Sequence, residues 1–180
     1  MMSQAQDIQA GAAMEKTATE EPVQTAEYQC HMISEGKATG RVLFSKDPFC
    51  FYLVDPKNGV VLDKNHCLYG QSIADTILVF PNGSGSSVVQ ADGMYQLKIA
   101  GTEPRAMVVR NLDTTLVASA IIMESPLVNR LPEEFYANTH DGDIVTVNAT
   151  DELVTVEASG LGADGVAVGL DGAKTAETEG

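Results

Sequence analysis

Cysteine pairs, clusters of basic residues and long apolar runs are all missing from this sequence. Its three cysteines, Cys30, Cys50 and Cys67, are far apart and form no Cys-x-x-Cys pair or cysteine–histidine group. The sequence therefore does not indicate a zinc or iron–sulfur site of its own. An odd number of widely spaced cysteines favours a reducing compartment. We expect all three to be buried as small apolar residues.

Positive charge is scarce, because 11 lysines and arginines stand against 25 acidic residues, which gives a formal net charge of −14. Nucleic-acid backbones and anionic membranes bind clustered lysine and arginine, so we expect neither as a partner. The two ends of the chain carry much of the negative charge, since residues 1–27 and 157–180 each contain five acids and one lysine. The middle region has the modest charge of an ordinary soluble domain.

Apolar runs long enough to cross a membrane are absent, and the first residues lack the basic and apolar regions of a signal peptide. We therefore expect a cytoplasmic protein. Residues 1–27 and 159–180 have few large apolar side chains and are predicted to be flexible tails, the second one acidic. One domain is predicted over residues 28–158.

The predicted domain mixes strands and helices. We predict strands over 28–33, 38–44, 73–80 and 104–110, helices over 86–100, 114–123 and 132–136, and a hairpin of 143–147 with 152–156. The strand–helix–strand order of residues 73–110 predicts a βαβ unit with parallel strands. Residues 45–70 form a long irregular loop, which in a small domain is more often functional than accidental.

A glycine- and serine-rich turn, residues 80–87, connects the predicted strand 73–80 to the predicted helix. Gly83 and Gly85 allow a positive φ angle or the close approach of a ligand. Ser86 or Ser87 would lie at the helix N-cap, where free backbone N–H groups and the helix dipole favour an anion. An ordinary capped helix after a glycine turn is the alternative interpretation.

Six short motifs in this order and spacing resemble the small subunit, or swivel domain, of the aconitase X family. They are Asp55-Pro56, Asp63-Lys64-Asn65-His66, Gly70-Gln71-Ser72-Ile73, the turn at residues 80–87, Gly101-Thr102-Glu103-Pro104 and Asp141-Gly142-Asp143. The resemblance covers about residues 30–156. It implies an α/β fold of the swivelling β/β/α type, with a mixed sheet, flanking helices and an edge hairpin.

The resemblance also implies an activity, namely that of a hydro-lyase (dehydratase) subunit that works only with an aconitase X large subunit. Family members dehydrate 3-hydroxy acids such as cis-3-hydroxy-L-proline or mevalonate 5-phosphate. The large subunit is expected to hold an iron or iron–sulfur centre that takes the hydroxyl, so this chain is expected to carry no cofactor or metal. Ser86 matches the serine that removes the α-proton as the base, and Gly83, Ser84, Gly85 and Ser87 are expected to contact the substrate.

Other residues keep more than one interpretation. A serine is a poor base unless helix N–H groups or a cation stabilise its alkoxide in a water-poor site. Asp63 and His66 are candidate substrate contacts, but they are equally suited to pin the long loop by bonding to each other or to backbone. The arginines are scattered, and none is marked by its position as a carboxylate clamp. A non-catalytic binding or assembly module of the same fold is the alternative function.

Overall fold

The structure, a computed structural model, describes residues 25–157. The predicted tails, apart from residues 25–27, lie outside the described residues. The elements are β1 (Thr25–Gln29), β2 (His31–Ser34), β3 (Lys37–Phe44), η1 (Phe51–Leu53), β4 (Val54–Asp55), β5 (Val60–Val61), β6 (Thr76–Phe80), α1 (Ser87–Ala100), β7 (Ala106–Val109), α2 (Thr114–Ile122), β8 (Leu127–Asn129), α3 (Glu133–Asn138), β9 (Ile144–Asn148) and β10 (Leu153–Glu157). Within this range no helix combines the length and apolar character needed to cross a bilayer.

One mixed sheet organises the fold, with strand order β1-β10-β9-β3-β6-β7-β8-β2. Strands β3, β6, β7 and β8 run parallel, and the remaining pairs are antiparallel. The β6–α1–β7 segment is the predicted βαβ unit, and β9–β10 is the predicted hairpin. Both predictions are confirmed, as is the mixed α/β fold class.

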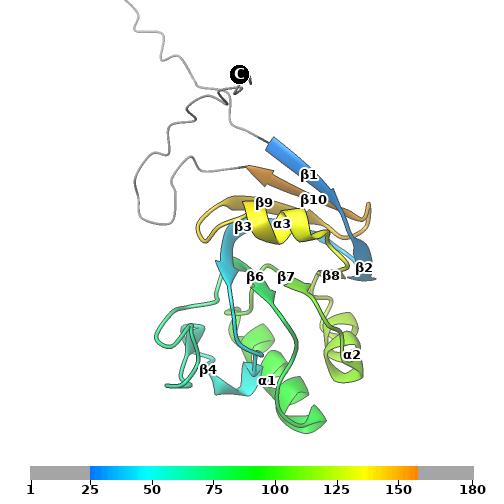
Figure 1. Ribbon diagram of the computed structural model, residues 1–180. Helices are drawn as coiled ribbons and strands as arrows, with labels where there is room; N and C mark the ends of the chain where they lie inside the picture. The colour runs from blue at the N-terminus through cyan, green and yellow to red at the C-terminus, as the bar shows by residue number, and fades with distance from the viewer. Residues whose placement is uncertain (1–24, 158–180) are drawn as a thin grey trace, which may run out of the picture.

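The two outer strands of this sheet are consecutive in the chain. β1 pairs with β10 at one end of the strand order, β2 pairs with β8 at the other, and only Cys30 separates them. Because one residue spans only about 3.8 Å, the sheet must curl until its ends meet, as the path of β1 into β2 shows (Figure 1). The prediction of one strand over 28–33 is therefore wrong. The chain switches partners at Cys30, whose N–H donates to the Glu152 carbonyl at 3.0 Å.

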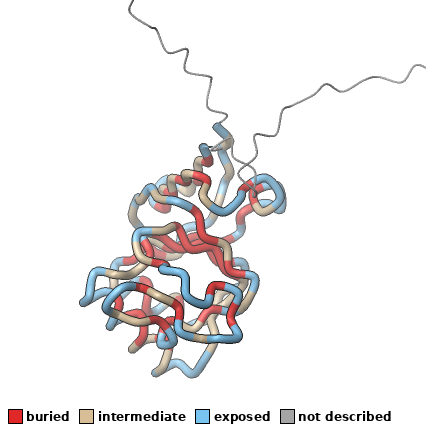
Figure 2. The backbone as a smooth tube through the Cα atoms, turned by 90° about the vertical axis from the view of Figure 1, so that its left-hand side faces the viewer, coloured by how far each residue is buried: buried red, intermediate tan, exposed pale blue. Residues whose placement is uncertain are grey.

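Curling divides the apolar core into two clusters, one on each face of the sheet. Val79, Val108 and Val145 belong to a cluster that also includes Phe135 of α3. The other cluster joins alternate residues of the same strands to α1, α2 and η1. β6 and β7 are buried on both faces, which explains their continuous apolar sequences. The buried segments cross the middle of the molecule and the exposed ones surround them (Figure 2).

Helix α1 is placed by a glycine near its middle. A Cβ atom at Gly93 would overlap the backbone of Phe51 and Tyr52, so only glycine lets η1 lie directly against the helix. Gly101 ends the helix in the left-handed conformation, at φ 69°, and its N–H donates to the Lys98 carbonyl. Because η1 belongs to the long loop after β3, the close contact at Gly93 attaches this loop to α1.

Candidate functional site

The carboxyl ends of β3, β6 and β7 lie at one edge of the sheet, and the three loops that follow them meet there. These are residues 45–50, residues 81–86 and residues 110–113. Ligands of open parallel sheets bind outside this edge, because the loops and helix N-termini gather there. We call it the carboxyl edge.

The glycine-rich turn is fixed to the loop after β3 by backbone hydrogen bonds. The Ser84 N–H donates to the Phe49 carbonyl at 2.9 Å, and the Phe49 N–H donates to the Asn82 carbonyl at 2.9 Å. Gly85 adopts φ 98°, which side chains rarely tolerate. At Gly83, a Cβ would come within 2.5 Å of Gln90 Nε2 and 2.6 Å of Asp113 Oδ2, so a larger residue would displace these two side chains.

A buried glutamine completes the attachment. Gln90 is 2% exposed; its Oε1 accepts from the Phe51 N–H at 3.1 Å, and its Nε2 donates to the Phe49 carbonyl at 3.2 Å. Gln90 therefore connects α1 to the loop after β3 through two buried hydrogen bonds, which hold the start of the helix in place.

Ser86 is the N-cap of α1, where the sequence predicted it, but its side chain makes no cap hydrogen bond. The residue is exposed, and the first turn of the helix contains no acidic side chain. An ordinary N-cap serine accepts an N–H of the first turn. The Ser86 hydroxyl therefore lies beside the positive end of the helix dipole without a bond to the helix N–H groups. Ser87, also exposed, is the first residue of the helix, while Ser84 is half-buried in the turn.

Asp63 and His66 do not contact each other through their side chains in the bonds that the structure records. Asp63 Oδ1 accepts the Asn65 N–H at 2.9 Å. His66 is 9% exposed; its Nδ1 accepts the Leu68 N–H at 3.1 Å, and its Nε2 lies 3.2 Å from Ser45 Oγ. These bonds favour the interpretation that both residues pin the loop, and substrate contact by either stays a prediction.

One group of side chains within residues 25–157 has the spacing of metal ligands. Donor atoms of Asp47, His66 and Cys67 lie within 4.8 Å of one another. The Leu68 N–H bonded to His66 Nδ1 places the hydrogen of a neutral ring on Nε2, which then has no lone pair for a metal facing the other two groups. The Cys67 N–H also donates to Asp47 Oδ2 at 2.8 Å. This bond is the main reason that the pKa of Asp47 is lowered. The group is better explained as hydrogen bonding than as a metal site.

The cysteines occupy three separate places. Cys30 joins β1 to β2, and Cys50 precedes η1. Burial and then the Glu152 carboxylate raise the pKa of the Cys30 thiol to about 11. Cys67 is exposed, and its Sγ accepts the Lys46 N–H at 3.2 Å, while Cys30 and Cys50 are half-buried. The expectation that all three are buried is therefore wrong. An iron–sulfur cluster needs several thiolates together, and the described residues do not provide them.

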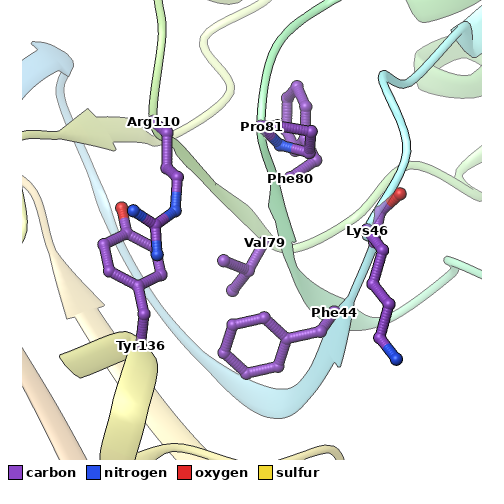
Figure 3. A pocket seen from close by; sticks show the side chains of 8 residues that line it. Phe44, Lys46, Val79, Phe80, Pro81, Arg110 and Tyr136 are labelled. Atoms are coloured by element: carbon purple, nitrogen blue, oxygen red, sulfur yellow. The ribbon is translucent and has the colours of Figure 1, made fainter. Parts of the chain in front are cut away.

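A pocket of about 320 Å³ opens at the carboxyl edge. It is lined by Phe44, Ser45, Lys46, Val79, Phe80, Pro81, Arg110 and Tyr136. The Arg110 guanidinium lies 3.6 Å from the centre of the Tyr136 ring (Figure 3). Burial raises the pKa of the Tyr136 hydroxyl, and the nearby Arg110 guanidinium offsets only part of that rise.

Sequence reasoning missed the basic and aromatic members of this pocket. Arg110 is the first residue after β7, and position directly after a parallel strand is a signal that could have singled it out among the scattered arginines. Tyr136 comes from α3, and nothing in the sequence indicates that this helix faces the ends of β6 and β7.

The described residues thus define an α/β domain with a curled mixed sheet and a glycine-rich turn at its carboxyl edge. Residues 27–156 match the family model of the aconitase X swivel domain, and the chain belongs to that family. The phosphomevalonate dehydratase small subunit of Methanosarcina acetivorans is 43% identical over 123 residues, which are 68% of this chain and 85% of that protein. That of Methanococcoides burtonii is 41% identical over 131 residues, 72% of this chain and 95% of that one. The crystal structure of Thermococcus kodakaraensis aconitase X in its holo-form is 35% identical, with a TM-score of 0.67 over 73% of this chain and 98% of that chain.

Proposed function

We propose that this protein is the small subunit of an aconitase X dehydratase and that Ser86 removes the α-proton of a 3-hydroxy acid. Two curated relatives at 43% and 41% identity are named phosphomevalonate dehydratase small subunits, which favours mevalonate 5-phosphate over cis-3-hydroxy-L-proline as the substrate. An aconitase X large subunit is the partner.

The position of Ser86 carries this proposal. Its hydroxyl is exposed and makes no cap bond, although it stands at the start of a 14-residue helix. A proton that leaves the carbon beside the substrate carboxylate would pass to Ser86 Oγ. The free N–H groups of the first turn stabilise the oxygen in the anionic form that this step requires.

The remaining half of the reaction is assigned to the large subunit. Loss of the hydroxyl from the neighbouring carbon requires a group that accepts it, and we propose that an iron centre of the partner does so. The separation of the three cysteines in this chain supports that assignment. A close interface with the partner would also exclude water from the exposed serine.

Substitution of Ser86 by alanine in the assembled two-subunit enzyme tests the proposal. We expect Ser86→Ala to lower the dehydration rate by about 10²–10⁴-fold, the usual contribution of a positioned base. Complex formation, measured by size-exclusion chromatography, should not change. Exchange of the substrate α-proton with deuterated solvent, measured by NMR, should disappear together with turnover.

Ser87→Ala is the matched control, since Ser87 is equally small and exposed one position further on. Because Ser87 is expected only to contact the substrate, its replacement should act on KM and leave kcat within a few-fold. Turnover that survives in Ser86→Ala would show that the base lies elsewhere. A complex that forms but never dehydrates a 3-hydroxy acid would instead favour the alternative, an assembly module without catalytic activity.

A further inference from the structure

We propose that the pocket at the carboxyl edge binds the phosphate group of the substrate, with Arg110 as the principal ligand and Lys46 as the second. This inference rests on the proposed function, and it adds the residues that would select a phosphorylated substrate. A dehydratase of cis-3-hydroxy-L-proline would not need this pocket, because that substrate has no phosphate group.

Arg110 is held in a fixed orientation at the pocket wall. Its Nη1 donates to Glu133 Oε1 at 2.7 Å, and its guanidinium plane covers the Tyr136 ring at 3.6 Å. Within residues 25–157 the structure records no partner for its Nε and Nη2 groups. Arginine presents its donors as a planar fork that suits a phosphate. The orientation reduces the entropy lost when an anion binds.

The ion pair with Glu133 leaves Arg110 able to bind a phosphate. The glutamate side chain is 80% exposed, so water screens its charge strongly. It occupies one of the five N–H donors and leaves the others available.

Lys46 supplies a second positive charge on the other side of the pocket. Figure 3 shows Lys46 and Arg110 on opposite sides, with Val79 and the ring of Phe44 between them. The Lys46 ammonium forms no ion pair with the described residues, and its four-carbon stem lets it turn toward a ligand.

The charge and size of the pocket match a phosphate monoester. Such a group carries about two negative charges at neutral pH, which two cations neutralise, whereas a carboxylate carries only one. The volume of about 320 Å³ is suited to a small metabolite. Pro81 lines the pocket and also begins the turn that leads to Ser86, so the pocket and the base belong to one continuous edge.

The first experiment measures phosphate binding by the full chain without its partner. Inorganic phosphate, titrated at constant ionic strength, should give saturable changes in the amide NMR signals of Lys46, Arg110 and Tyr136. Arg110→Gln should weaken binding by about 10–100-fold, the usual loss for a charged hydrogen bond. Lys46→Gln should weaken it by about two- to fivefold. Arg110→Lys, which keeps the charge, should recover part of the affinity.

Arg105→Gln is the matched control, because Arg105 stands at the opposite end of β7 and is also exposed, at 53% against 40% for Arg110. It should bind phosphate as the unmodified chain does. Phosphate affinity that stays within twofold in Arg110→Gln would overturn the proposal. So would acetate that binds as tightly as phosphate, because the pocket would then select any anion.

A second experiment separates this inference from the proposed function. In the assembled enzyme, Arg110→Gln should raise KM for mevalonate 5-phosphate by about 10–100-fold and change kcat by less than about threefold. A kcat that falls with KM unchanged would overturn the phosphate assignment. Because phosphate binding needs no turnover, a wild-type chain that binds phosphate through Arg110 but gives no dehydration would contradict only the proposed function.

Discussion

Strand β7 has an arginine at each end, and the two are placed very differently. Arg105, just before the strand, donates to Asp75 at 3.1 Å, and the neighbouring Lys98 pairs with Glu103 at 3.1 Å. These four residues line a smaller pocket of about 180 Å³ at what we call the amino edge. Arg110, just after the strand, lines the larger pocket with Lys46; it is also paired, with Glu133 at 2.7 Å, but this glutamate does not line the pocket. Both arginines are thus paired, but the amino-edge pocket contains the acidic partners among its lining residues and the carboxyl-edge pocket does not.

The comparison also extends to what lies beneath each edge. The Arg105–Asp75 pair of the amino edge joins two exposed side chains, so water screens it. The carboxyl edge is instead supported from inside, by Gln90 under the glycine-rich turn and by His66 under the loop after β3. Buried polar bonds position a surface more firmly than exposed ones do. The buried polar contacts therefore lie under the edge at which we propose that the substrate binds.

The largest effect is expected when a methyl group is added at Gly93, where α1 contacts η1, and compared with one added at Gly101, where α1 ends. Gly93→Ala would force a Cβ into the backbone of Tyr52, so we expect a loss of about 3 kcal/mol or more in the free energy of unfolding. Gly101→Ala, near the amino edge, meets no atom within 4 Å and only strains a φ of 69°, so it should cost about 1 kcal/mol. Urea unfolding measures both. Equal losses would show that η1 does not depend on close contact with α1.

A smaller loss is expected from Gln90→Leu, which keeps the size of the side chain but removes both hydrogen bonds to the loop after β3. The buried Phe51 N–H and Phe49 carbonyl would lose these partners, and we expect a cost of about 2–3 kcal/mol. Gln96→Leu is the control on an exposed position of the same helix and should stay within about 0.5 kcal/mol. Similar stabilities for the two variants would remove the argument that the carboxyl edge is anchored from inside.

Sequence patterns predicted the elements of the fold better than their closure. The apolar run before Phe80 and the cap at Asp113, which accepts the Leu116 N–H at 2.8 Å, specify β6 and α2 locally. The division of β1 from β2 at Cys30 depends on two distant partners, β10 and β8. No local pattern carries that information. Thr25 likewise joins β1, ahead of the predicted domain start, because β10 offers it a partner at Glu157.

The candidate site divides in the same way. Ser86 was found because glycines and serines gather in one short stretch of sequence, and its position at the helix start agrees with that prediction. The pocket residues Lys46, Arg110 and Tyr136 are 90 positions apart at the extremes and are brought together by the sheet and α3. Such a site becomes visible only after the strands are ordered.

A pH-dependent effect is expected in the loop after β3. The Cys67 N–H lowers the pKa of Asp47, and a carboxyl group with a depressed folded-state pKa stabilises the fold above its unfolded pKa. That contribution should disappear as the pH falls from about 5 toward 2. Asp47→Asn keeps an acceptor oxygen but removes the charge, so its stability deficit against wild type should shrink over this range. A deficit that stays constant with pH, measured by urea unfolding, would contradict the assignment.

The smallest effect is expected at the amino edge itself. Arg105→Gln and Asp75→Asn, made singly and together, isolate the free energy of the Arg105–Asp75 pair. Asparagine is the right replacement because Asp75 has a φ of 61°, which asparagine tolerates. The two side chains are 53% and 81% exposed, so the coupling should be about 0.2–0.5 kcal/mol and should vanish in 1 M salt. A coupling above about 1 kcal/mol that survives salt would mean that the amino edge is also built rigidly. The contrast between a screened amino edge and a rigidly supported carboxyl edge would then no longer distinguish the edge that we propose binds substrate.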